Sequence, residues 1–186
     1  LEMLKKIKNM LPDKLYLKFR YKKIMGYHLN LKEPKTFNEK LQWLKLYDRN
    51  PKYTKLVDKY EVKRIISKKI GEEYIIPTLG VWNKFDEIDF NSLPNQFVLK
   101  STHDSGGLII CRDKSKLDLG VAKEKIETSL LNNFYYVGRE WPYKNVSPRI
   151  IAEQYMENDI YNYKMLGFEH TPRMVLVYSG VFSENG

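Results

Sequence analysis

The spacing of apolar residues changes near Tyr74, from a helical period to short runs that are typical of strands. Before that point, apolar residues recur every three or four positions between lysines and arginines. Pro12 and Gly26 bracket one such segment, where they favour the first turn and the end of a helix. We therefore expect residues 1–73 to be helical, beginning with a short amphipathic helix over Leu1–Met10.

Capping residues predict two more helices in this region. Thr36-Phe-Asn-Glu39 is a capping box, and the helix that it opens ends before Asn50-Pro51. The residues expected to turn one face of this helix into the core are Phe37, Leu41, Trp43, Leu44 and Tyr47. A second start at Asp58-Lys-Tyr-Glu61 opens a helix that ends at Gly71. Its helically spaced apolar residues are Val62, Ile65, Ile66 and Ile70.

From Tyr74 onward the pattern predicts a sheet with one helix on it, and hence an α+β fold. The apolar runs are Tyr74–Ile76, Leu79–Trp82, Phe97–Leu99, Leu108–Cys111, Ile150–Met156, Tyr161–Phe168 and Met174–Tyr178. The helix is expected within Lys114–Asn133, beginning after Leu119-Gly120, with Ile126 and Leu130 on its inner face. Asp86–Leu93 is either a short helix or a loop.

The stretch Gln96–Asp113 predicts a hairpin with a polar tip. One apolar run ends at Lys100, the next begins at Leu108, and two glycines, Gly106 and Gly107, stand between them. Adjacent glycines allow backbone N–H groups to approach an anion, and Lys100 adds a charge that suits a phosphate. The alternative is an ordinary hairpin whose glycines only supply positive φ angles. Neither the Walker motif nor the dinucleotide fingerprint is present.

Composition and charge limit the kinds of molecule that the chain is expected to contact. The chain has 186 residues, of which 42% are hydrophobic, so it can bury a core. Its one cysteine, Cys111, excludes an internal disulfide, fits a reducing compartment, and is expected to be a buried thiol. Residues 1–70 hold 20 Lys and Arg against 7 Asp and Glu, whereas residues 71–186 hold 12 against 16. The basic half either faces an anionic lipid surface, glycan or nucleic acid, or is a solvated helical surface. No uncharged apolar run is long enough to span a membrane.

Several segments together resemble the ATP-grasp enzymes of the teichuronopeptide-biosynthesis type, many of which are labelled as polysaccharide-biosynthesis proteins or glycosyltransferases. The resemblance runs from about Thr36 to the end of the chain. It is carried by Thr36-Phe-Asn-Glu-Lys-Leu-Gln-Trp43, Val57-Asp-Lys-Tyr60, Gly71-Glu-Glu-Tyr-Ile-Ile-Pro77, Phe97-Val-Leu-Lys-Ser-Thr-His-Asp-Ser-Gly-Gly107, Arg139-Glu-Trp-Pro-Tyr143, Pro148-Arg-Ile-Ile-Ala-Glu-Gln-Tyr-Met156 and Asn162-Tyr-Lys164. The N-terminal basic segment lies outside the clear match. Together with the helical pattern before Tyr74, the resemblance divides the chain into a basic helical region at 1–73 and an incomplete ATP-grasp-like nucleotide-binding region at 74–186.

The resemblance also implies how ATP is held. Lys100 resembles the family lysine on the α- and β-phosphates, and Lys164 resembles a second phosphate-side lysine. The flexible phosphate-covering loop corresponds to His103 to Gly107, including Ser105 and Gly106. The adenine linker corresponds to Glu153, Gln154, Tyr155 and Met156, and Asp159 is the candidate for the ribose hydroxyls. The Mg²⁺ ligands of the family are expected beyond Gly186, so no metal ligand is assigned in this chain.

Structural interpretations of the same residues stay open. Glu153 either serves the nucleotide or pairs with Arg149 or a lysine across the sheet, and Lys164 is either a phosphate contact or a solvated strand residue. The aromatic residues Tyr135, Tyr136 and Tyr143 either join the core or stack on a sugar, whereas Trp141 is expected in the core. The three histidines show no metal-ligand spacing.

The resemblance favours an ATP-dependent ligase of cell-surface polysaccharide synthesis, which activates a carboxylate as an acyl phosphate for amide formation. The alternatives are a glycosyltransferase of capsular or cell-wall synthesis and a truncated, non-catalytic nucleotide-binding remnant. The expected partners are a nucleotide and an anionic polysaccharide or lipid-linked precursor, and no nucleic acid. Residues 1–26 would give a cytoplasmic protein a peripheral contact with the inner membrane face, with Leu4, Ile7 and Leu11 as a shallow apolar face.

Overall fold

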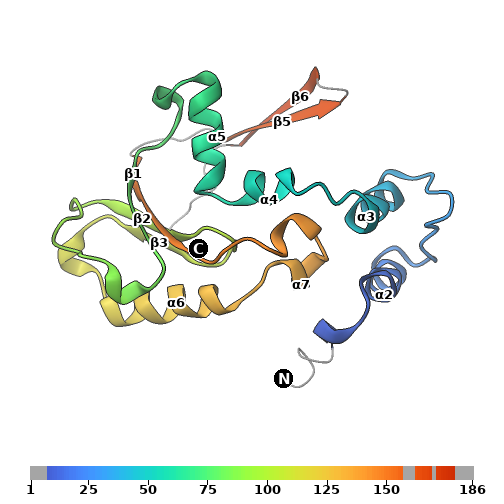
Figure 1. Cartoon of the computed structure of the whole chain (residues 1–186), viewed down its shortest axis with the longest axis horizontal. Helices are drawn as coiled ribbons and strands as arrows, with labels where there is room; N and C mark the ends of the chain where they lie inside the picture. Colours follow the sequence, from blue (N-terminus) through green and yellow to red (C-terminus); the bar gives the residue numbers. More distant parts are fainter. Residues whose placement is uncertain (1–7, 157–161, 169–170, 179–186) are drawn as a thin grey trace. The chain divides into compact units, whose positions relative to one another are not determined.

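The computed structural model describes residues 8–156, 162–168 and 171–178, which divide into two compact units at Gln154–Tyr155. The helices of the first unit are α2 (Asp13–Met25), α3 (Phe37–Tyr47), α4 (Lys52–Val57), α5 (Glu61–Ile70), α6 (Leu119–Leu131) and α7 (Tyr135–Gly138) (Figure 1). Its short 3₁₀ helices are Glu72–Tyr74, Phe85–Glu87, Lys114–Lys116 and Trp141–Tyr143. The N-terminal helices and the sheet confirm the α+β prediction. The predicted domain division at residues 73 and 74 stays a prediction.

Four antiparallel strands form the sheet of the first unit in the order β1-β4-β2-β3. These strands are β1 (Thr78–Trp82), β2 (Phe97–Ser101), β3 (Leu108–Cys111) and β4 (Ile150–Gln154). The hairpin predicted for β2 and β3 is confirmed, with Leu99 opposite Ile109. Of these four strands, β4 comes last in the sequence, yet it lies between β1 and β2. The second unit is an antiparallel hairpin of β5 (Asn162–Phe168) and β6 (Thr171–Tyr178).

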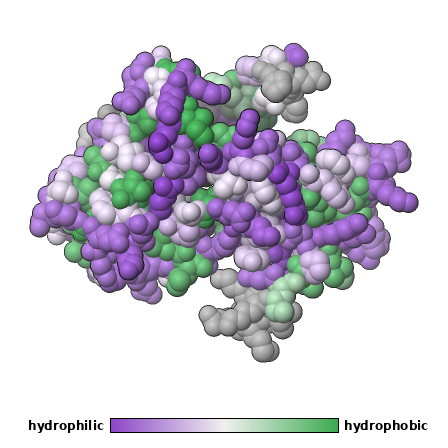
Figure 2. Space-filling model, viewed as in Figure 1, coloured by the Kyte–Doolittle hydropathy of each residue, from purple (hydrophilic) through white to green (hydrophobic). Residues whose placement is uncertain are grey.

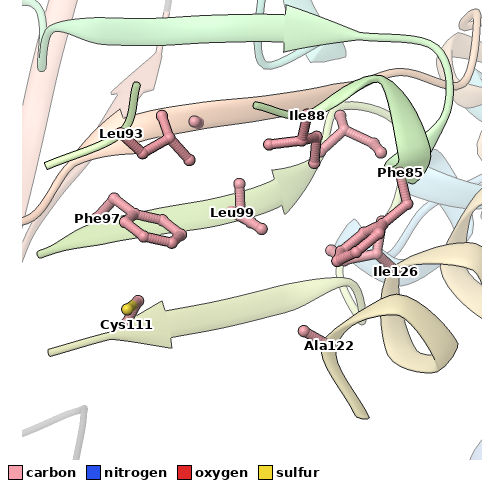
Figure 3. Close-up of a cluster of buried hydrophobic side chains, with 10 residues drawn as sticks. Phe85, Ile88, Leu93, Phe97, Leu99, Cys111, Ala122 and Ile126 are labelled. Atoms are coloured by element: carbon pink, nitrogen blue, oxygen red, sulfur yellow. The ribbon is translucent and has the colours of Figure 1, made fainter. Parts of the chain in front are cut away.

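The main core lies between one face of this sheet and α6. Phe97 and Leu99 of β2 lie in one cluster with Ala122 and Ile126 of α6, and all four are buried (Figure 3). Asp118 caps α6 by accepting from the N–H of Val121. The Cys111 thiol is also buried in this cluster, and burial raises its pKa. The expectation of a buried thiol is therefore confirmed.

A second, smaller cluster joins α2 to α3. It consists of Tyr16, Leu17, Tyr21, Leu29 and Leu46. The capping box of α3 is present, but the predicted core stripe is wrong. Its five residues, from Phe37 to Tyr47, are 38–66% exposed, because α3 turns Leu46 and Glu39 inward toward α2 and Leu29. The spacing of apolar residues identifies an apolar face of α3, but it does not show which face packs against another part of the protein.

The segments around α5 also differ in part from expectation. The helix begins at Glu61 and ends at Gly71 as predicted, yet none of its residues is fully buried. Of the two apolar runs near Pro77, only the second is a strand, because Tyr74 ends a 3₁₀ turn instead. Most of the predicted helix Leu1–Met10 lies outside the described residues, and residues 8–10 are helical.

A buried arginine connects the N-terminal segment to α7. Arg139 is 1% exposed, and its Nη2 donates to the carbonyl oxygens of Lys8 at 2.7 Å and Leu11 at 3.2 Å. Its guanidinium lies 4.7 Å from the ring centre of Tyr16 and 5.4 Å from that of Tyr135. Cation–π contacts of this kind are stronger when they are shielded from water. The aromatic segment after α6 is thus anchored, with Tyr135 buried.

Alkaline pH should weaken this anchor. Burial and, after it, the hydrogen bond to Asp13 together raise the pKa of Tyr135 from the usual value near 10 to about 12. Between about pH 10 and pH 12 the unfolded chain therefore loses this proton first, which lowers the free energy of unfolding. Urea titrations should show the stability gap between wild type and Tyr135→Phe closing over this range.

The exposed Tyr74, substituted as Tyr74→Phe, is the matched control. A gap between wild type and Tyr135→Phe that stays constant from neutral to strongly alkaline pH would contradict the shift in the Tyr135 pKa.

Candidate functional site

Alternation along β2 divides its side chains between the two faces of the sheet. Phe97, Leu99 and Ser101 are buried on the face that α6 covers, so Val98 and Lys100 point to the other face. On β4, Glu153 lies opposite Val98, and its carboxylate therefore shares this second face with Lys100. The sheet thus brings together two residues that are 53 positions apart in the sequence.

Glu153 is bound by two lysines. Lys100 Nζ lies 2.5 Å from Glu153 Oε2, and Lys63 of α5 forms an ion pair with Oε1 of the same carboxylate. The Glu153 side chain is only 5% exposed. Burial raises the pKa of this carboxyl, but the hydrogen bonds and charges of Lys100 and Lys63 outweigh burial and hold its pKa below the ordinary value. Glu153 is therefore ionised at neutral pH, and the trio carries one net positive charge.

A third lysine binds the loop between β2 and β3. Lys59, just before α5, donates from Nζ to the carbonyl oxygens of Ser101, at 2.7 Å, and Asp104. Its own N–H donates to the Thr102 carbonyl at 3.1 Å. Burial lowers the pKa of Lys59, and the nearby charge of Asp104 opposes that effect. The start of α5 therefore positions the loop.

The same helix start is bound to β4 through an arginine. Arg149, next to β4, donates from Nη2 to Asp58 at 2.7 Å and to Glu61 at 3.2 Å. Its guanidinium lies 4.7 Å from the ring centre of Tyr60. Its carbonyl oxygen accepts from the Thr102 N–H at 2.9 Å. Helix, loop and strand thus meet through polar contacts.

The loop of residues 102–107 is closed and partly buried. Ser101 N–H donates to the Gly107 carbonyl at 2.9 Å, and the buried His103 places Nε2 2.9 Å from the Asn132 carbonyl. Asp104 accepts from the Ser129 hydroxyl of α6 at 2.7 Å. Neither glycine of the loop has φ in the left-handed region, so the interpretation that they only supply positive φ is wrong. Gly107 is instead required by space.

The predicted site residues fall into three groups. Lys100 and Glu153 are in contact, and the loop from His103 to Gly107 follows directly on β2, with Ser105 and Gly106 exposed. Gln154 is the exposed end of β4. Tyr155, Met156 and Lys164 belong to the second unit, with Lys164 exposed on β5, and Asp159 lies outside the described residues. The roles of all these residues at a nucleotide stay predictions.

The chain also matches a known protein family. The family described as TupA-like ATPgrasp matches residues 39–185, which is most of the chain. The chain belongs to this family. Membership in the ATP-grasp family implies ATP binding, and it confirms the resemblance found in the sequence. No curated protein and no solved structure matches the chain.

Sequence reasoning missed two lysines that the structure places beside the predicted residues, Lys59 and Lys63. The segment Val57–Tyr60 was recognised as a family motif, but Asp58-Lys-Tyr-Glu61 was interpreted only as a helix start. Asp58 does accept from the N–H groups of Tyr60 and Glu61. The available signal for Lys59 was its place in the family segment Val57–Tyr60, and Lys63 follows four residues later, in the first turn of α5.

A cavity of about 380 Å³ opens on the other side of the loop. It lies between the loop and α6 and is lined by Asp104, Gly106, Val121, Glu124, Lys125, Thr128, Ser129 and Asn132. Lys100 and Glu153 do not line it. The cavity therefore borders the loop without containing the lysine–glutamate trio.

The metal ion that the ATP-grasp family implies finds no donor set here. Within residues 8–156 and the two strands of the hairpin, no three His, Cys, Asp or Glu side chains are grouped so that they could hold a metal ion. Two acidic residues at the start of α5, Asp58 and Glu61, are engaged by Arg149. No catalytic step is therefore assigned to a metal in this part of the chain.

Gly107 provides a test of the loop. A Cβ at this position would lie 2.3 Å from Ser101 Oγ and 2.4 Å from Ser129 Oγ, whereas one at Gly106 would meet only Asp104 Oδ2 at 3.4 Å. Gly107→Ala should therefore lower the free energy of unfolding by about 1–3 kcal/mol, as overpacking does. Gly106→Ala is the matched control and should change stability by less than about 0.5 kcal/mol. Equal urea midpoints for the two variants would show that Gly107 is not sterically required.

Proposed function

We propose that this chain binds ATP at Lys100, Glu153 and the loop of residues 102–107, as part of a carboxylate–amine ligase acting on cell-surface polysaccharide or its precursors. The observation that carries the proposal is the trio of Lys63, Glu153 and Lys100, which carries one net positive charge next to a closed glycine loop. Family membership supports the nucleotide. An ammonium group is a common partner of phosphate oxygens.

The proposed reaction makes a carboxylate reactive. An acceptor carboxylate oxygen attacks the γ-phosphorus of ATP, the bond to the β-phosphate oxygen breaks, and ADP leaves. An amine then attacks the carbonyl carbon of the acyl phosphate, inorganic phosphate leaves, and the nitrogen loses a proton to solvent. Lys100 would offset charge on the phosphates, which is a recurring way to assist phosphoryl transfer. The loop would exclude water from the acyl phosphate, which water would otherwise hydrolyse.

The remaining predicted contacts complete the proposal. Gln154, Tyr155 and Met156 would carry adenine, Asp159 the ribose, and Lys164 a further phosphate. The position of Gln154 supports the start of this linker, because β4 ends at Gln154 directly after the buried Glu153. A uronic acid acceptor rests on the family resemblance alone.

Substitution of Lys100 tests the nucleotide assignment. Loss of one charge-assisted contact is worth about 1.5–3 kcal/mol, so Lys100→Ala should weaken ATP binding about ten- to one-hundred-fold by calorimetry. Lys123→Ala is the control, because Lys123 lies on α6 and pairs with Asp86 at the surface. Unchanged ATP affinity in folded Lys100→Ala would remove Lys100 from the site.

The same titrations separate the alternative functions. A glycosyltransferase would prefer a nucleotide sugar over ATP, and a panel of nucleotide sugars tests this directly. ATP binding without any product from uronic acid and amine acceptors in the presence of Mg²⁺ would favour the non-catalytic remnant.

We also propose that the outer face of α2 contacts anionic lipid, which would place the protein at the cytoplasmic face of the membrane. The predicted face of Leu4, Ile7 and Leu11 does not provide this surface in the described residues: Leu4 and Ile7 lie outside them, and Leu11 packs on the α2–α3 cluster. Among the described residues, no helix is long and apolar enough to cross a membrane. Any membrane contact made by this part of the chain would therefore be peripheral.

The outer face of α2 combines cations with apolar side chains. Leu15 and Phe19 are 42% and 64% exposed, four residues apart and hence on one side of the helix. Beside them are the exposed lysines Lys14, Lys18 and Lys22. Elsewhere hydrophilic residues predominate on the face shown in Figure 2, with separate hydrophobic patches. A basic surface with a few large apolar residues suits an anionic interface.

Charge removal tests this contact. Each lysine near an anionic surface contributes about 1 kcal/mol, so the triple substitution of Lys14, Lys18 and Lys22 to Gln should weaken co-sedimentation with phosphatidylserine vesicles about one-hundred-fold at low salt. The control removes three exposed charges elsewhere, by substituting Lys68, Lys69 and Lys116 with Gln. Equal sedimentation of both triple variants would exclude α2 as the contact.

A further inference from the structure

We propose that Glu153 holds Lys100 until a nucleotide phosphate binds Lys100 in place of the carboxylate. Lys63 makes this release of Lys100 possible, because it stays paired with Glu153. The inference rests on the proposed binding of ATP at Lys100. Its basis is the shared carboxylate: Oε2 of Glu153 binds Lys100 at 2.5 Å, while Oε1 binds Lys63. Each lysine thus has its own oxygen.

The two lysines are not equivalent. Lys63 also donates to the Ile76 carbonyl at 2.6 Å and is 15% exposed at its side chain, whereas Lys100 is 30% exposed. Lys100 is therefore the member of the trio that a ligand can reach. Lys63 is also held by the backbone of Ile76, which lies just before β1.

Charge balance explains why a second lysine is needed. If a phosphate takes Lys100, Glu153 keeps Lys63, and a neutral buried pair remains. Without Lys63, departure of Lys100 would leave a buried carboxylate with no cation, which is strongly unfavourable. Lys59 cannot replace Lys63, because its ammonium is bound to the carbonyl oxygens of Ser101 and Asp104. Lys63 is accordingly a positioning residue that acts on the nucleotide through Glu153 and Lys100.

This role predicts an unusual pattern of affinities for ATP and for inorganic tripolyphosphate, measured by calorimetry at fixed salt. Lys63→Met should weaken both ligands about ten-fold, because Lys100 becomes the sole partner of Glu153. Glu153→Gln should bind tripolyphosphate several-fold more tightly than wild type, because Lys100 is free. The double variant Lys63→Met/Glu153→Gln should regain the tripolyphosphate affinity of Glu153→Gln. Lys63→Arg should recover most of the wild-type affinity.

An equal loss from Lys63→Met in both backgrounds, wild type and Glu153→Gln, would overturn the proposal, because Lys63 would then act without Glu153. Lys63→Gln, which retains a donor for the Ile76 carbonyl, replaces Lys63→Met if that variant does not fold.

A measurement without nucleotide separates this inference from the ATP assignment. The rate of acetylation of Lys100, followed by mass spectrometry, should fall in Lys63→Met and rise in Glu153→Gln, because ion pairing makes the amine less nucleophilic. Unchanged rates would overturn the ion-pair exchange itself. Changed rates together with unchanged ATP affinity in Lys100→Ala would show that Lys63 and Lys100 share Glu153 as described while the ATP assignment is wrong.

Discussion

The Glu153 carboxylate lies on a central strand, with little access to water, and much of the first unit is arranged around the need to neutralise it. A buried charge is tolerated only when it is paired and hydrogen-bonded. Here the two cations come from different elements, Lys100 from β2 and Lys63 from α5. The pairing therefore has a structural role, because it joins α5 to the sheet.

This constraint accounts for an otherwise puzzling helix. None of the residues of α5 is fully buried, and its apolar residues Val62, Ile65 and Ile66 are only partly buried. What holds it are polar contacts: Lys63 with Glu153, Arg149 with Asp58 and Glu61, and Lys59 with the carbonyl oxygens of the loop. Such contacts are directional. They consequently fix the position of the loop more specifically than apolar packing would, because apolar contacts have no preferred direction.

The sequence predicted the elements that are determined locally. The hairpin around the glycine loop, the inner face of α6, the capping box at Thr36 and the buried Cys111 all follow from short-range patterns. The family motif identified Lys100 and Glu153 together. Lys63 could not be found in this way, because it meets Glu153 only when β4 inserts between β1 and β2, a pairing of segments 90 residues apart. The α3 stripe failed for a related reason, since periodicity shows that a face is apolar and not what covers it.

Arg139 gives the N-terminal helices a different kind of attachment. The α2–α3 cluster contains five buried residues, too few to form an independent core of the usual size. Its connection to α7 is largely polar. The Arg139 guanidinium lies among tyrosine rings and binds the carbonyl oxygens of Lys8 and Leu11, Tyr135 hydrogen-bonds to Asp13, and the Tyr16 hydroxyl donates to the Val137 carbonyl at 3.2 Å. Contacts of this kind can open without exposing the core between α6 and the sheet. The amide protons of α2 should therefore exchange with solvent as a separate cooperative group, faster than those of β2 and β4.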